Sequence, residues 1–173
     1  MESKFAETLW SSKKHDYNTP LWLFEKLNKH YEFETDPATN SENPLGCKTY
    51  FTPKEDGLSW ERWNGPVFIN PPYDRKVQHL WVYEANKYSY NTMRTVVMLL
   101  PARQDTRLWQ NFIFPEADLI CFIKGRLKFS GHENAAPFGS ALVVFHSYPY
   151  QMIKDDEKQL YKDIGRIIRC DYS

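Results

Sequence analysis

Three short apolar runs, each of which ends in polar residues, place the strongest limit on the fold of this chain. They are Val67–Ile69, Thr95–Leu100 and Leu119–Ile123, and stretches of helical character separate them. Near-continuous apolar strands that alternate with helices are typical of a mostly parallel sheet covered on both faces. We therefore expect an α/β protein.

The remaining elements are predicted from local patterns. Thr19-Pro20 indicates a helix start, with Thr as the N-cap and Pro at the first helical position. The segment 37–55 is shorter than the about 30 residues that a strand-helix-strand unit needs. One helical crossover is therefore expected to be missing, which shortens the first half of the sheet. Further strands are predicted at 33–35, 48–52 and 141–145, and helices at 20–31, 75–90, 105–114 and 154–169.

Length and charge limit the function. With 173 residues the chain is expected to form one domain, 19–173, preceded by an arm, 1–18. Lys plus Arg and Asp plus Glu are both 22, so the net charge is zero and any nucleic-acid contact must be local. No run approaches the length of a membrane span. We expect a cytoplasmic protein that binds no membrane.

The cysteines and histidines show no pattern of a binding site. Cys47, Cys121 and Cys170 are far apart, which favours neither a disulfide framework nor a zinc site. The five histidines show no metal-ligand spacing. We therefore expect no metal.

The tetrapeptide Asn70-Pro71-Pro72-Tyr73 directly follows the first apolar run. The two prolines remove two backbone N–H donors, which leaves acceptors: the Asn70 side-chain oxygen and the Pro71 carbonyl. Tyr73 adds a flat ring beside them. Converging acceptors with an aromatic face suit an exocyclic amino group of a base, as methyl transfer to a base nitrogen requires. The same tetrapeptide could also be only a rigid loop after a strand.

Polar residues follow four of the predicted strands. Asp36, Asn70, Arg103 and Arg126 each lie just past a strand end. Ligands of open α/β sheets bind beyond the carboxyl ends of the strands. A shared site is therefore expected there.

The order of these motifs resembles a known family. Thr19-Pro20, Asp36-Pro37-Ala38, Asp56-Gly57-Leu58 and Asn70-Pro71-Pro72-Tyr73 stand in the order found in amino-methyltransferases that use S-adenosylmethionine. The stretch from about 18 to 146, with Pro101-Ala102-Arg103 and Gly125 to Phe129, more closely resembles the small phage-type DNA adenine-N6 methyltransferases (Dam-like).

The resemblance implies a fold and a site. The fold would be a Rossmann-like methyltransferase sheet, mostly parallel with an antiparallel last strand. Asn70, Pro71, Pro72 and Tyr73 would be catalytic, and the cofactor would be S-adenosylmethionine. Its expected contacts are Thr19, Pro20, Asp36, Ala38, Asp56, Leu58 and Asn70.

Other roles remain open for some of these residues. Asp36 and Asp56 are also common turn formers, and Thr19 is also a simple helix cap. The Gly-rich turn that many such enzymes place after the first strand is absent, since the segment reads Asp36-Pro37-Ala38-Thr39-Asn40. Cofactor binding is therefore expected to depend more on side chains.

The expected reaction is site-specific methylation of adenine N6 in DNA, on a base flipped out and stacked on Tyr73. DNA contacts are expected from Arg103, Arg107, Lys124, Arg126 and Lys128, although the two residues Arg103 and Arg126 could instead pair with carboxylates. The recognised DNA sequence is expected to be short. It would be read by the loop between Ile123 and Ala141 or by a second subunit of a homodimer.

Three other functions fit the same sequence. Cytosine N4 presents the same amine geometry, and so does a glutamine side-chain amide in a protein. A non-catalytic nucleic-acid-binding relic of the fold is the alternative from a different class, although the intact Asn70, Asp36 and Asp56 argue against it.

Overall fold

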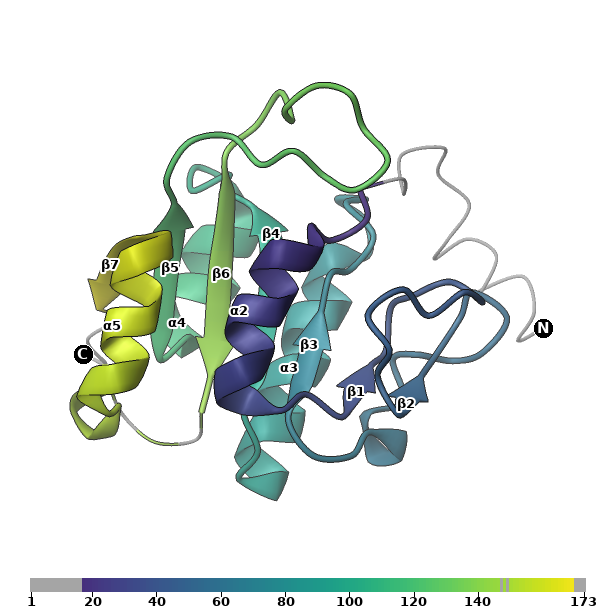
Figure 1. Cartoon of the computed structure of the whole chain (residues 1–173). Coiled ribbons are helices and arrows are strands. Elements are labelled where there is room, and N and C mark those ends of the chain that lie inside the picture. The colour runs from purple at the N-terminus through teal and green to yellow at the C-terminus, as the bar shows by residue number, and fades with distance from the viewer. Residues whose placement is uncertain (1–16, 147, 149, 170–173) are drawn as a thin grey trace.

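A computed structural model describes residues 17–146, 148 and 150–169 of the chain (Figure 1). Within this part, seven strands form one sheet in the order β2-β1-β3-β4-β6-β5-β7. The strands are β1 (Thr35–Asp36), β2 (Thr49–Tyr50), β3 (Val67–Ile69), β4 (Val96–Pro101), β5 (Leu119–Ile123), β6 (Ser140–Phe145) and β7 (Gly165–Arg169).

Five of these strands run in the same direction. β1 pairs in parallel with β2 and β3, and β3 pairs in parallel with β4. β6 is inserted between β4 and β5 and is antiparallel to both, while β7 is antiparallel to β5 at the edge. The predicted mixed α/β fold with a mostly parallel sheet and an antiparallel strand at 141–145 is confirmed.

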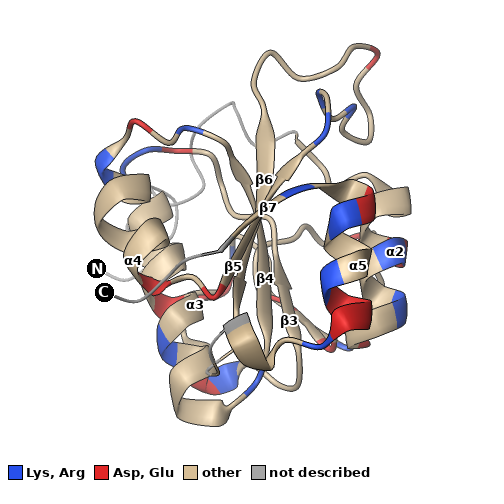
Figure 2. Cartoon of the chain, turned by 90° about the vertical axis from the view of Figure 1, so that its left-hand side faces the viewer, with Lys and Arg blue, Asp and Glu red and all other residues tan. Residues whose placement is uncertain are grey.

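Helices cover both faces of the sheet. α2 (Leu21–Tyr31) and α5 (Asp155–Ile164) lie on one face, and α3 (Gln78–Thr92) and α4 (Phe114–Glu116) lie on the other (Figure 2). A π-helical turn, η2 (Trp109–Ile113), leads into α4, and η1 (Trp60–Arg62) and η3 (Tyr150–Met152) are short 3-10 helices. None of the described helices is both long and apolar enough to span a bilayer.

The strand residues alternate between two hydrophobic cores. Val67 and Met98 belong to the core under α3, whereas Phe68 and Val97 belong to the core under α2 and α5. This is the period of two that a strand buried on both faces requires. The alternation explains why the apolar runs are continuous in the sequence.

The first half of the sheet is short. β1 and β2 have two residues each, and residues 37–48 between them form no helix. The expected loss of one crossover helix is therefore confirmed. The loop that replaces this helix lies beyond the end of β1, where it forms part of the pocket described below.

The chain ends differently from the prediction of one helix over 154–169. α5 stops at Ile164, and Gly165–Arg169 pair with β5 as β7. A Cβ atom on Gly165 would lie 2.0 Å from the Phe122 carbonyl oxygen, so only glycine permits this close approach. The predicted arm falls outside the described residues, except for Tyr17 and Asn18.

Candidate functional site

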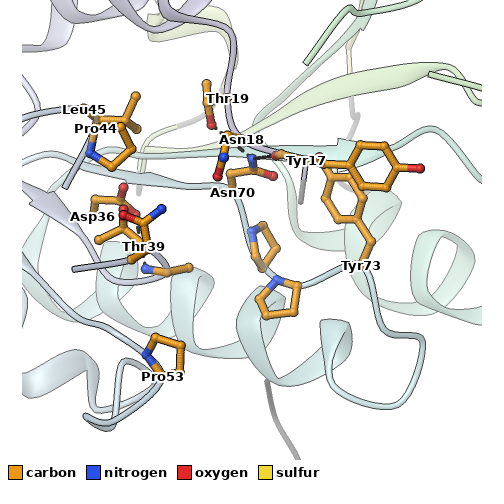
Figure 3. A pocket seen from close by; sticks show the side chains of 14 residues that line it. Tyr17, Asn18, Thr19, Asp36, Thr39, Pro44, Leu45, Pro53, Asn70 and Tyr73 are labelled. Carbon is orange, nitrogen blue, oxygen red and sulfur yellow. Dashed lines mark hydrogen bonds between the residues drawn. The ribbon is translucent and has the colours of Figure 1, made fainter. Parts of the chain in front are cut away.

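A pocket of about 250 Å³ lies beyond the carboxyl ends of β1 and β3 (Figure 3). β1 and β3 are neighbours in the sheet, and Thr35 pairs with Val67. The pairing therefore brings Asp36 and Asn70, which follow these residues, to one pocket. Its lining residues are Tyr17, Asn18, Thr19, Asp36, Ala38, Thr39, Asn40, Pro44, Leu45, Pro53, Asn70, Pro71, Pro72 and Tyr73.

Two hydrogen bonds fix the direction of the Asn70 carboxamide. Its Nδ2 donates to the Tyr17 carbonyl oxygen at 2.7 Å and to Thr19 Oγ1 at 3.0 Å. A backbone carbonyl can only accept, so the nitrogen of the amide must face Tyr17. Within the described chain no group donates to Oδ1 of Asn70, which leaves that oxygen available as an acceptor.

Pro71 and Pro72 continue the pocket wall after Asn70. Both are buried, and neither has an N–H to donate. In the described part of the chain the Pro71 carbonyl accepts no backbone or side-chain hydrogen bond. Two oxygens without a described donor therefore follow one another along the chain at this position.

The Tyr73 ring lies inside a cluster of aromatic side chains. It stacks on Tyr17, with centroids 5.6 Å apart and an interplanar angle of 23°, and meets Phe129 and Phe138 edge to face. The side chain is only 8% exposed, and its buried hydroxyl has no partner among the described residues. In this structure Tyr17 therefore covers the ring face that was expected to take a base.

Asp36 is a buried carboxylate in this pocket. It is 3% exposed, and its Oδ1 accepts a hydrogen bond from the Ala38 N–H at 3.1 Å. Burial raises the pKa of Asp36 to about 7, although the hydrogen bonds from Ala38 and Thr39 oppose the rise. No Lys or Arg of the described chain forms an ion pair with it. A cationic ligand would therefore favour its charged form.

Thr19 lies in the pocket rather than at a helix cap. α2 begins at Leu21, and no side chain caps it, so the predicted capping role of Thr19 is wrong. Its hydroxyl instead accepts the Asn70 bond, and its carbonyl accepts a bond from Ser130 Oγ at 3.1 Å. Pro20 is the residue before the helix and is buried.

Asp56 and Leu58 lie outside this pocket. The exposed Asp56 carboxylate accepts bonds from the Leu58 N–H and from Ser59 Oγ, as a turn former does. Leu58 packs partly buried against the core under α3. Gly57 between them lies so close to the Pro37 carbonyl that a Cβ atom would be 2.1 Å from its oxygen. The turn therefore packs directly against the loop that follows β1.

The predicted basic residues do not share the Asn70 pocket. Arg103 and Arg107 line a second pocket beyond the end of β4. Lys124, Arg126 and Lys128 follow β5 and are exposed. β6 separates β4 from β5. Of the four polar residues expected in a shared site, Asp36 and Asn70 lie together, whereas Arg103 and Arg126 do not join them.

Several pocket residues were not singled out from the sequence as site residues. Tyr17 and Asn18 directly precede Thr19, and Pro44, Leu45 and Pro53 lie in loops without a motif. Only the proximity of Tyr17 and Asn18 to the Thr19-Pro20 pair offered a signal. Among the described residues, no group of three or more His, Cys, Asp or Glu side chains is placed to hold a metal ion.

Comparison with known proteins gives one family. The model of the family described as DNA N-6-adenine-methyltransferase (Dam) matches residues 7–167 of the chain. No curated protein matches. Among solved structures, the chain is similar to protein LPL1258 from Legionella pneumophila, with 16% sequence identity and a TM-score of 0.40 over 72% of this chain and 52% of that one. The chain thus spans about half the length of that protein.

Proposed function

Since the chain belongs to the Dam family of DNA N-6-adenine-methyltransferases, we propose that it transfers a methyl group from S-adenosylmethionine to N6 of a flipped-out adenine in DNA. The orientation of Asn70 is the observation that carries this proposal. Its Nδ2 is engaged by Tyr17 and Thr19, so Oδ1 remains as an acceptor beside the Pro71 carbonyl. The domain is 19–173, and its sheet is a variant of the Rossmann-like methyltransferase sheet.

The two oxygens act on the adenine amine. The N6 lone pair is delocalised into the ring, which makes this nitrogen a poor nucleophile. Hydrogen bonds from both amine protons, to Asn70 Oδ1 and the Pro71 carbonyl, favour a pyramidal nitrogen and expose its lone pair. After methyl transfer the positively charged nitrogen loses one proton to solvent. The protein thus contributes positioning and fixed acceptors.

The pocket residues fit a cationic cofactor. When bound, S-adenosylmethionine supplies a methyl group on a positively charged sulfur, which leaves as a neutral thioether and needs no acid. Asp36 supplies the carboxylate that pairs with this half of the cofactor. Pro44, Leu45 and Pro53 line the same pocket with apolar surface. By the family resemblance, Asp56 and Leu58 would hold the adenine of the cofactor, although neither residue lines the pocket.

The flipped adenine stacks on Tyr73, where it takes the place of the Tyr17 ring. Tyr17 is the residue that stacks face to face on Tyr73 in the described chain. Phe129 and Phe138 make T-shaped contacts with the same ring. Base entry therefore requires Tyr17 to move, while the aromatic edges stay in place.

Measuring methylated nucleosides in DNA from cells that make the protein tests this function. We expect N6-methyladenine with the wild type and with Asn91→Ala, an exposed asparagine on α3 that serves as the matched control. In turnover assays with the purified protein, Asn70→Ala should lower kcat about 100-fold or more. This is the usual loss when one fixed hydrogen-bonding group at the reacting atoms is removed.

Other outcomes of the nucleoside measurement separate the alternatives. N4-methylcytosine in place of N6-methyladenine would show that the base is wrong. If no methylated base appears and calorimetry with S-adenosylmethionine gives no heat of binding, the chain is a non-catalytic relic and the proposal fails.

A further inference from the structure

A second pocket, of about 300 Å³, lies at the same edge of the sheet as Asn70. Pro101 ends β4, which is the neighbour of β3, and Gln78 begins α3. We call it the arginine pocket. It is lined by Arg75, Gln78, Pro101, Arg103, Thr106, Arg107, Leu108 and Trp109.

The arginine pocket carries three positive charges without a described counter-ion. Arg75, Arg103 and Arg107 line it, and no Asp or Glu does. None of the three forms an ion pair with another residue of the described chain. Guanidinium groups that are left unpaired around one cavity favour an oxyanion with several acceptor oxygens.

Gln78 adds a donor that lacks an acceptor. The side chain is 4% exposed, and its buried Nε2 has no partner among the described residues. A buried amide nitrogen is rarely left unpaired unless a ligand or water completes it. Because Gln78 is the first residue of the 15-residue helix α3, it also stands at an end where anions are favoured.

The arginine pocket is separated from Tyr73 by one side chain. The Arg103 guanidinium carbon lies 6.0 Å from the centroid of the Phe138 ring. The Phe138 ring in turn meets Tyr73 edge to face, with centroids 5.7 Å apart. An anion held in the pocket is therefore close to a base that stacks on Tyr73.

We propose that the arginine pocket binds a single backbone phosphate of the DNA beside the flipped adenine. This inference rests on the proposed function, since it needs DNA as the substrate. Gln78 Nε2 and the arginines donate to the phosphate oxygens. Such a contact fixes the register of the strand without reading its sequence.

The test combines protein variants with DNA in which one phosphate is neutral. Duplexes carry a site mapped in expressing cells, and each has one methylphosphonate near the target adenine. Binding is measured by fluorescence anisotropy, which needs no turnover. With the wild type, one position should lower the affinity about tenfold, in line with loss of a charge-assisted contact.

Arg75→Gln and Gln78→Met should each weaken binding of the unmodified duplex. A methylphosphonate at the position that matters for the wild type should change the affinity of these two variants little. Gln159→Met, an exposed glutamine on α5, should behave as the wild type does. Arg75→Gln should also reduce the slope of log affinity against log salt concentration by about 0.9, whereas Gln78→Met should leave the slope unchanged.

Two results would overturn the proposal. The first is that the fold-loss of affinity from the substitution and the fold-loss from the methylphosphonate multiply at every position. The two changes would then act independently, which means that no DNA phosphate occupies the pocket. The second is that inorganic phosphate binds the wild type more tightly than the variants, while no methylphosphonate position lowers the affinity of the wild type for DNA. The arginine pocket would then be a site for a free anion. Failure of the proposed function is seen separately, as the absence of methylated adenine with the wild type.

Discussion

Asp36 and Asn70 line one pocket, but the protein leaves them in different states. Asn70 is held by two hydrogen bonds and has one oxygen to spare. Asp36 is buried without a described cation, and its pKa is raised to about 7. The amide is thus fixed in one orientation, whereas the carboxylate has no positive charge beside it in the described chain.

Asp36→Asn should make the protein more stable at pH 8. A carboxyl whose pKa rises from 3.8 to about 7 on folding favours the folded state below the lower value, and this contribution is lost as pH rises through the higher one. The variant avoids this loss of stability. Its free energy of unfolding should therefore exceed that of the wild type by at most about 4 kcal/mol at pH 8 and by close to zero at pH 4. Urea unfolding at the two pH values measures the difference.

The same substitution should abolish binding of S-adenosylmethionine in calorimetry. For the wild type, we expect affinity to increase between pH 6 and pH 8, because the charged carboxylate holds the cation. Asp163→Asn, an exposed carboxylate on α5, is the control for both measurements. Equal affinity of Asp36→Asn and the wild type would show that Asp36 does not contact the cofactor.

Tyr17→Ala should make base flipping easier. The Tyr17 ring occupies the face of Tyr73 that the adenine needs, and such a ring contact is worth roughly two- to tenfold in an equilibrium. The fluorescence of 2-aminopurine at the target position should increase by that factor, while Tyr17→Phe should match the wild type. A decrease with Tyr17→Ala would mean that the ring holds the base instead of competing with it.

Tyr73 itself gives a further comparison with the same probe. Tyr73→Phe should retain flipping, because the Tyr73 hydroxyl has no described partner. Tyr73→Ala should lose it, because the stacking surface is gone.

At the scale of elements, a buried contact between Glu157 and His146 holds α5 to the sheet. Glu157 of α5 lies 2.6 Å from Nε2 of His146, which directly follows β6, and Tyr31 of α2 donates a hydrogen bond to the same carboxylate. Burial raises the pKa of Glu157, but the interactions with His146, Tyr31 and His30 together outweigh it, so the net pKa is lowered.

Glu157→Gln should therefore destabilise the protein by about 3 kcal/mol at pH 7, because it leaves one half of a buried pair. A carboxyl with a lowered pKa stabilises the fold above its unfolded value, and this contribution is lost as pH falls through the folded one. The difference from the wild type in urea should thus shrink toward pH 3. Glu25→Gln, on the exposed side of α2, is the control, and a difference that grows with acid would contradict the assignment.

Elements with a strong local period could be predicted, and those set by tertiary contacts could not. The helix predicted at 20–31 matches α2 to within a residue, and Phe24 and Leu27 lie on its buried face. Ile167 and Ile168 also fit a helical stripe, but pairing with β5 makes them part of a strand. The sequence around Ile167 does not indicate that the edge of β5 is available for pairing.

The site followed the same division. Asp36 and Asn70 were predictable because each comes at the carboxyl end of a predicted strand, and these ends lie at the same edge of the sheet. The role of Thr19 was not, because its partner, Asn70, is 51 residues away in the sequence. Tyr17 was missed for the same reason, since it meets Tyr73 only in the folded chain.

At the scale of the whole molecule, the charges cancel in number. Lys plus Arg equals Asp plus Glu at 22, and Lys and Arg lie on helices as well as on loops beyond one end of the sheet (Figure 2). Lys124, Arg126 and Lys128 are exposed on such a loop. DNA binding should therefore depend on these loops and not on a field from the whole protein.

Replacing these three residues by Gln should weaken DNA binding and flatten its salt dependence by about 2.7 in the log–log slope if each meets a phosphate. Anisotropy titrations between about 50 and 200 mM salt measure the slope. Replacing Lys26, Lys29 and Lys162, which lie on α2 and α5, controls for total charge. An unchanged slope with the first set would exclude this loop from the DNA contact.

The bond between Asn70 and the Tyr17 backbone has a practical consequence. The oxygen that orients the Asn70 amide belongs to the main chain and not to a side chain. A substitution that shifts the backbone at Tyr17 would therefore disturb the amide even though the Asn70 side chain itself is unchanged.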